Sequence, residues 1–251
     1  MEKAIKNWDW DEVRKAWPKK FEAERFIFQE IHPGDRIFIG TGCGEPQHLV
    51  RELLNYINKN PKAFLDAELI NIVTLGVAPY TNEKFKDNFR LKSFFIGNTV
   101  RRAINRGAAD YTPIFLSAVP DLIRTERMRI DAALIQTTPP DENGEMNLGV
   151  SVDIVKAAIE EANLVVAQAN SNMPYVQGDG KINIEDVDFI APYDEPLLEY
   201  LEEVPGDISQ RIGSYVSRII EDGSTIQVGY GSIPNCYCIQ LWRQKTSWNP
   251  Y

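Results

Sequence analysis

The 251-residue chain is poor in the residues that most often build disulfide frameworks, metal sites and nucleophile-histidine pairs. It holds two histidines and three cysteines, and Cys236 and Cys238 stand close together near the C-terminus. Three cysteines do not make a disulfide framework, and a Cys-x-Cys pair without a second ligand pair lacks the spacing of a zinc site. We therefore predict neither a disulfide-stapled fold nor a bound metal.

Positive charge and long apolar runs are also scarce. Thirty-six acidic residues against 27 Lys plus Arg give a net charge of −9, which repels nucleic acid and anionic membranes. No segment reaches the roughly 18 apolar residues of a membrane span, and residues 1–17 lack the apolar core of a signal peptide. We expect a cytoplasmic protein that binds neither nucleic acid nor membrane, with enough hydrophobic content, 43%, for a buried core.

Short apolar runs alternate with segments of helical spacing along most of the chain. Apolar runs of strand length are followed by amphipathic segments, as in a βαβ unit. This alternation predicts an α/β fold: an open, mostly parallel sheet with helices on both faces. The expected strands cover residues 36–40, 68–75, 91–97, 111–116, 131–137 and 164–170, and the expected helices cover 22–31, 46–57, 98–107 and 150–162.

The composition of the sequence changes after residue 190. Residues 191–207 hold three prolines and many acids, which indicates a linker after a first domain of residues 1–190. A helix at 209–220 and a strand at 225–229 then predict the start of a second, incomplete α/β domain over 208–235. The stretch GSTIQVGYGSI (223–233) also follows the same sequence plan as GDRIFIGTGCG (34–44): a glycine turn, a short apolar run and then two glycines at matching positions. Either α/β proteins simply reuse this junction, or two similar domains lie in tandem.

Single motifs in the first domain carry little chemistry. Gly40 and Gly42 lack the third glycine of a dinucleotide fingerprint. Glu45 is better explained as a turn residue near the positive end of a helix than as a catalytic carboxylate. We expect His32 to lie in a turn and His48 to be solvated, which leaves a Ser-His-Asp or Cys-His site without support.

Two loops that follow apolar runs are better candidates. The loop at 137–151, TTPPDENGEMNLGVS, is either a stiff connection or part of a ligand site at the edge of the sheet. The glycine turn GYGSI (229–233) could present backbone N–H groups to an anion or to a developing oxyanion.

Several stretches together resemble the acetyl-CoA hydrolase and 4-hydroxybutyrate CoA-transferase family. They are GDRIFIGTGCGEPQHLV, GAADYTPIFLSAVPDLI, PPDENGEMNLGVSVDIVKAAIEEA, QANSNMPYVQG and VGYGSIPN, in this order along the chain. Two details depart from the family pattern. Gln168 replaces the usual glutamate, and Tyr175-Val176-Gln177 replaces the usual Arg-Thr after Met-Pro.

The resemblance implies an enzyme of two open α/β domains with the active site between them. In such enzymes a glutamate carboxylate attacks an acyl-CoA thioester, and the glutamyl-CoA thioester then passes CoA to a second carboxylic acid. The implied substrates are coenzyme A thioesters, acetyl-CoA among them, and short acids such as 4-hydroxybutyrate. Homo-oligomerisation is left open. The glycine turn that contacts CoA corresponds here to Gly229, Tyr230, Gly231, Ser232 and Ile233.

The tail from Cys236 to Tyr251 does not match the family. A frameshift after Asn235 explains it, because the tail's codons can be read one base later as AIASSSGDKKHLGIHT. Both Trp codons in that stretch end in GG and therefore force glycines where the family needs them. This hypothesis places the nucleophilic glutamate directly after Tyr251, so the 251 residues hold no catalytic residue. The alternative is a shortened homologue that serves as a non-catalytic binding or partner subunit.

Overall fold

The computed structural model describes residues 9–76, 78–200, 205–229 and 231–244. The chain divides into two compact units, Met1–Glu199 and Tyr200–Tyr251, and the division falls within the predicted linker. Each unit is described separately below.

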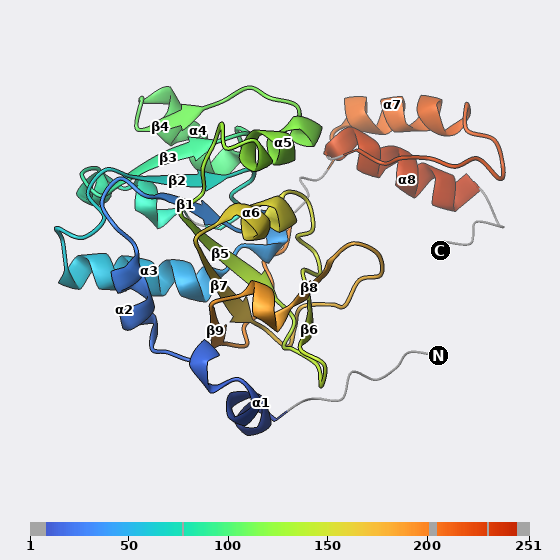
Figure 1. Cartoon of the computed structure of the whole chain (residues 1–251). Coiled ribbons are helices and arrows are strands. Elements are labelled where there is room, and N and C mark those ends of the chain that lie inside the picture. The colour runs from blue at the N-terminus through green and yellow to red at the C-terminus, as the bar shows by residue number, and fades with distance from the viewer. Residues whose placement is uncertain (1–8, 77, 201–204, 230, 245–251) are drawn as a thin grey trace. The chain divides into compact units, whose positions relative to one another are not determined.

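Seven parallel strands form the sheet of the first unit, in the order β4-β3-β2-β1-β5-β7-β9 (Figure 1). Strands β5 and β7 are buried along their whole length, and β1 and β2 nearly so, which explains their continuous apolar runs. The open parallel sheet predicted from the alternation is confirmed. The strands are β1 Arg36–Ile39, β2 Ala67–Asn71, β3 Phe89–Ser93, β4 Ala109–Tyr111, β5 Ala132–Thr137, β7 Leu164–Ala169 and β9 Phe189–Pro192.

Helices cover both faces of this sheet, and each face has its own apolar core. One core contains buried side chains of α2, α3 and α4, whereas the other contains those of α1, α5 and α6. The helices are α1 Trp10–Ala16, α2 Glu24–Ile27, α3 Gln47–Lys59, α4 Asn98–Asn105, α5 Val119–Arg124 and α6 Val155–Glu161. The 3-10 turns are Pro18–Lys20, Phe28–Glu30, Gly42–Gly44, Pro79–Thr81, Glu83–Phe85, Leu116–Ala118 and Ile184–Asp186.

The order of the strands reverses between β1 and β5. The chain leaves β1 toward β2 on one side, and later returns to place β5 on the other side of β1. Since α3, which follows β1, packs on one face and α6, the first helix after β5, packs on the other, the loops after β1 and β5 diverge at the carboxyl ends of these strands. Open α/β sheets bind their ligands at such a point.

The loop at 137–151 is ordered by its own side chains. The Asp141 carboxylate accepts hydrogen bonds from the backbone N–H groups of Asn143 and Glu145, each at 2.8 Å. The loop continues into β6, Glu145–Asn147, which pairs antiparallel with β8, Lys181–Asn183. These contacts favour the stiff connection over the ligand site.

In its described residues the second unit has two packed helices, α7 Asp207–Ser217 and α8 Ser232–Gln244. The strand expected at 225–229 is wrong, because these residues form no ladder with any described strand. Helix α8 continues through Gln244, and Cys236 and Leu241 are each 3% exposed.

Candidate functional site

Buried polar side chains gather where the sheet order reverses. Glu45 follows β1, Gln136 lies near the end of β5, and Gln168 and Asn170 lie at the end of β7. Each of the four is at most 3% exposed. Such burial of polar groups is costly unless they are hydrogen-bonded, so their partners define what the site can do.

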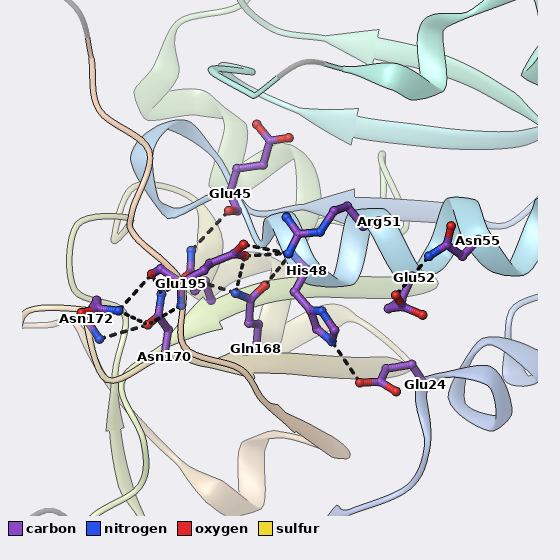
Figure 2. Close-up of polar contacts among 11 residues, drawn as sticks. Glu24, Glu45, His48, Arg51, Glu52, Asn55, Gln168, Asn170, Asn172 and Glu195 are labelled. Atoms are coloured by element: carbon purple, nitrogen blue, oxygen red, sulfur yellow. Dashed lines mark hydrogen bonds and ion pairs between the residues drawn. The ribbon is translucent and has the colours of Figure 1, made fainter.

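A continuous hydrogen-bond network joins these residues (Figure 2). The Gln136 amide donates to the Glu45 backbone oxygen at 3.2 Å and accepts from Asn170 Nδ2 at 2.7 Å. Gln168 Nε2 donates to Glu195 Oε1 at 2.8 Å, and Asn170 Nδ2 donates to the Glu195 backbone oxygen at 2.7 Å. The network therefore ties the ends of β1, β5 and β7 to the segment after β9.

Glu195 is the central acceptor of this network. Its carboxylate accepts from the His48 backbone N–H at 2.9 Å and from Arg51 at 2.8 Å, in addition to Gln168. Gln168 Oε1 accepts from the same His48 N–H at 3.1 Å. The two side chains thus cap the first turn of α3, whose N–H groups have no acceptor within the helix. Sequence reasoning missed Glu195 because it placed this residue in the linker.

The His48 side chain is held between neighbours. It is 14% exposed, its ring stacks on Tyr193 with centroids 3.9 Å apart, and its Nε2 lies 3.1 Å from Glu24 Oε1. The expectation of a solvated His48 is therefore wrong. His32 does lie in a turn, with 72% of its side chain exposed.

The Glu45 carboxylate points away from the network, although its backbone oxygen belongs to it (Figure 2). Its Oε2 accepts a hydrogen bond from the Gly76 backbone N–H at 3.2 Å, in the loop after β2. Burial raises the pKa of Glu45 to about 7, and the hydrogen bond from the Gly76 N–H offsets only part of this rise. Burial also raises the pKa of Tyr80, and the nearby Glu45 charge adds to this effect. Glu45 is therefore a buried titratable group as well as a turn residue.

The glycine turn proposed from the resemblance lies in the second unit. Gly229, Gly231, Ser232 and Ile233 are described, whereas Tyr230 lies outside the described residues, as do residues 245–251. Gly231 has a φ of +129°, which glycine adopts readily, and α8 begins at the next residue. The turn therefore leads into the first residues of a 13-residue helix, where backbone N–H groups favour anions.

The described residues include no group of three or more His, Cys, Asp or Glu side chains placed to hold a metal ion. None of their helices is both long and apolar enough to cross a membrane.

An open parallel sheet with a polar cluster at its reversal point is the architecture of a ligand-binding α/β domain. The acetyl-CoA hydrolase/transferase N-terminal domain matches residues 5–202, so the chain belongs to this family. The chain is 38% identical over 237 residues to a 4-hydroxybutyrate coenzyme A transferase of Clostridium kluyveri, covering 94% of this chain and 54% of that protein.

Other relatives agree with this family. A succinyl-CoA:acetate/propanoyl-CoA:succinate CoA transferase of Fasciola hepatica is 37% identical over 220 residues, which are 87% of this chain and 45% of that protein. A 4-hydroxybutyrate CoA-transferase structure from Porphyromonas gingivalis has a TM-score of 0.72 at 26% identity, covering 94% of this chain and 54% of that one. RipA from Yersinia pestis shares the fold, with a TM-score of 0.81 at 23% identity over 91% of this chain and 55% of its own. The chain thus spans about half the length of these relatives.

Proposed function

We propose that this chain is the N-terminal part of a CoA-transferase that moves CoA from an acyl-CoA to a short-chain carboxylic acid. Acetyl-CoA is the proposed donor and 4-hydroxybutyrate the proposed acceptor. The single observation that supports this most is the 38% identity to a 4-hydroxybutyrate coenzyme A transferase over 94% of this chain. Other relatives carry names with succinate or with butyryl-CoA and acetate, so proteins similar to this chain are named for several different acids.

The proposed reaction proceeds through a covalent glutamyl-CoA thioester. A glutamate carboxylate attacks the acyl-CoA thioester, CoA passes to the glutamate, and the acyl group leaves as its carboxylate. The second acid then takes CoA from the glutamate, which regenerates the free carboxylate. Gly229, Tyr230, Gly231, Ser232 and Ile233 are the proposed contacts to CoA. The proposal is supported by Gly229 and Gly231, which precede α8, and by Ser232 and Ile233, which begin it.

We infer that residues 236–251 are the product of a frameshift after Asn235, and that the nucleophile belongs to the native frame. The 251 residues contain no stretch resembling GIHTE, in which the family carries its glutamate. The described carboxylates of the first unit's polar cluster, Glu45 and Glu195, are both engaged by backbone N–H groups. We therefore expect the 251-residue polypeptide to be inactive alone.

The experiment compares this polypeptide with a longer one in which the frame is restored after Asn235. Acetyl-CoA and 4-hydroxybutyrate are supplied, and both the transfer of CoA and an enzyme adduct are followed by mass spectrometry. We expect transfer and an adduct only with the restored frame. Turnover by the 251-residue chain, with an adduct mapped to one of its own carboxylates, would refute the inferred position of the nucleophile.

The alternative is a shortened homologue that binds a partner without catalysis. Genomic DNA separates the two proposals. An open frame that continues one base out of register for a further domain supports a damaged enzyme gene, whereas a stop followed by unrelated sequence supports the short form.

A further inference from the structure

Glu45 is a buried titratable side chain to which the proposed reaction assigns no step. It is 1% exposed and lies at the turn that leads from β1 to α3. An ionised carboxylate at such a place is costly, because burial removes the water that would solvate the charge. The protonation state of Glu45 is therefore coupled to whatever keeps water out.

The backbone of Gly76, in the loop after β2, packs directly on this carboxylate. The Gly76 N–H donates to Glu45 Oε2 at 3.2 Å. A Cβ atom built on Gly76 would lie 2.9 Å from Glu45 Oε1 and 2.7 Å from Gln47 Nε2, so there is no room for a water molecule between Gly76 and these atoms. Water can therefore reach this side of the carboxylate only when Gly76 moves away.

The groups that act on Glu45 come from three parts of the fold. They are the N–H groups of Leu75 and Gly76, the amide of Gln47 at the start of α3, and Tyr80 in a 3-10 turn after the loop. The hydrogen bonds favour the ionised carboxylate, but burial outweighs them, so the pKa of Glu45 is about 7. Tyr80 is the titratable member of this group. Burial and the Glu45 charge both raise the pKa of Tyr80, so its phenol is neutral where Glu45 titrates.

Residues 74–76, called the Gly76 segment below, are fixed on one side and strained on the other. The Val73 backbone oxygen, just before the segment, accepts a hydrogen bond from the Gly42 N–H at 2.8 Å. Ala78, just after it, has a φ of +45°, a left-handed conformation that is unfavourable for a residue with a Cβ atom. The position of the segment therefore carries a conformational cost that its displacement can relieve.

The two protonation states of Glu45 place opposite demands on the Gly76 segment. The neutral side chain is compatible with the closed position, whereas the ionised one gains solvation when the segment moves and admits water. The carboxyl group then regains its ordinary pKa of 4.5, compared with about 7 in the closed position. The raised pKa therefore stabilises the closed position fully below pH 4.5, and this stabilisation is lost as pH rises through 7.

We propose that the Gly76 segment is a pH-sensitive switch, which lies closed on a neutral Glu45 and is displaced when Glu45 ionises. The loops after β1 and β2 lie at the carboxyl edge of the sheet, where open α/β sheets bind ligands. Displacement of the segment makes this edge more accessible above neutral pH than below it. The inference goes beyond the proposed function and does not depend on it, because it concerns residues of the first unit alone.

The test is hydrogen exchange of single amides in the 251-residue protein. NMR follows the exchange between pH 5 and 8, with correction for the intrinsic pH dependence of the exchange rate. Protection of the Gly76 N–H should fall about 50- to 100-fold over this range, as linkage requires for a group whose pKa is about 7 in the closed position and 4.5 in the open one. The Gly42 N–H, bonded to the Val73 oxygen, is the internal control and should keep its protection.

Two variants separate ionisation of Glu45 from other effects of pH. Glu45→Gln keeps a hydrogen-bond acceptor but cannot ionise, so its Gly76 protection should stay constant from pH 5 to 8. The matched control is Glu30→Gln, which removes an exposed carboxylate elsewhere in the same unit and should behave like the wild type. A carbon NMR titration of the Glu45 carboxyl group in the wild type needs no variant and should show a change of charge near pH 7.

Several results would overturn the proposal. One is constant protection of the Gly76 N–H in the wild type, and another is the same fall in protection in the wild type and Glu45→Gln. Loss of protection at Gly42 in step with Gly76 would mean that the whole unit opens and not the segment. A Glu45 carboxyl group that titrates near pH 4.5 would remove the coupling altogether. None of these results bears on the proposed CoA transfer.

Discussion

Two segments with the same sequence plan adopt different structures. Residues 34–44 form β1 and a glycine turn into α3, whereas the described residues of 223–233 form no strand and lead only into α8. The strand β1 has β2 on one side and β5 on the other, so both of its edges are hydrogen-bonded. The second segment has an apolar pattern of the same kind but no described neighbour in a sheet.

The difference between the two segments shows which elements form from local sequence alone and which need neighbours from elsewhere in the chain. A helix satisfies its backbone hydrogen bonds within itself, so α8 forms and packs on α7 through close approach of Cys236 to Gly213. A strand satisfies its hydrogen bonds only through neighbours, which here must come from distant parts of a chain. Sequence pattern alone therefore predicts the helix more safely than the strand.

The largest expected effect compares the same substitution at matched positions of the two segments. Ile37 in β1 is fully buried, whereas Ile226 is half-buried and belongs to neither apolar core. Ile37→Ala should lower the free energy of unfolding of the first unit by about 2–5 kcal/mol, and Ile226→Ala by less than about 1 kcal/mol. Urea unfolding followed by circular dichroism measures both. Similar losses at the two positions would mean that the second segment is packed as a strand after all.

The second prediction concerns the dependence of stability on pH, and it compares the residues that follow the two glycine turns. Glu45 follows the first turn, and the matched position in the second is Pro234, which does not titrate. The folded-state pKa of Glu45, about 7, lies above its ordinary value of 4.5. The contribution of Glu45 to the free energy of unfolding is therefore fully present below pH 4.5. It is lost as pH rises through 7, and the total loss is about 3 kcal/mol. Stability curves of the wild type and Glu45→Gln at pH 4.5–8 test this, and parallel curves would contradict the burial of the charge.

The third prediction concerns the cap of the helix in the first segment. Gln168→Glu would remove the amide that donates to Glu195 and place a second carboxylate beside the first. We expect a loss of about 1–3 kcal/mol, because the hydrogen bond is lost and two carboxylates then lie side by side in a buried place. Exchanging the two residues, Gln168→Glu with Glu195→Gln, reverses the direction of the bond and should recover part of the loss. A double variant no better than the single one would show that the pair is not coupled.

The smallest effect concerns the contact that holds α8. A Cβ on Gly213 would lie 2.7 Å from Cys236 Cβ, so Gly213→Ala should separate the two helices by a few tenths of an ångström or more. Ser214→Ala, one residue along, is the control. A Glu-specific protease should cut the wild type first within residues 191–207, and Gly213→Ala should then speed the loss of the second unit about twofold to fivefold. Equal rates in the two variants would contradict the packing of α7 on α8.

Much of the first unit could be predicted because its strands are buried on both faces. The runs at 36–40, 131–137 and 164–170 are apolar and lie between turn residues, and they became β1, β5 and β7 with ends within a residue or so. The runs at 68–75 and 91–97 gave strands that stop earlier, at Asn71 and Ser93. These polar residues turn their side chains to Thr74 and to backbone oxygens instead of continuing a ladder.

The polar cluster could not be predicted in the same way. Glu195 reaches Gln168 and Arg51 across 27 and 144 residues of sequence, and it lies in an acidic, proline-containing stretch that reads as a linker. Nothing in the local pattern distinguishes it from its exposed acidic neighbours. The burial of Glu45 was hidden for a related reason, because its partner Gly76 belongs to a loop 31 residues away.

The reversal of strand order between β1 and β5 has a consequence for how the protein is made. The backbone N–H of Arg36 is bonded to Asp131, 95 residues later in the chain, and the ladder of β1 with β5 follows from there. A ribosome adds roughly 5–20 residues per second, so β1 waits about 5–20 s for its second neighbour to be synthesised. During that time one edge of the most central strand, with its apolar side chains, is open to chaperones or to other nascent chains.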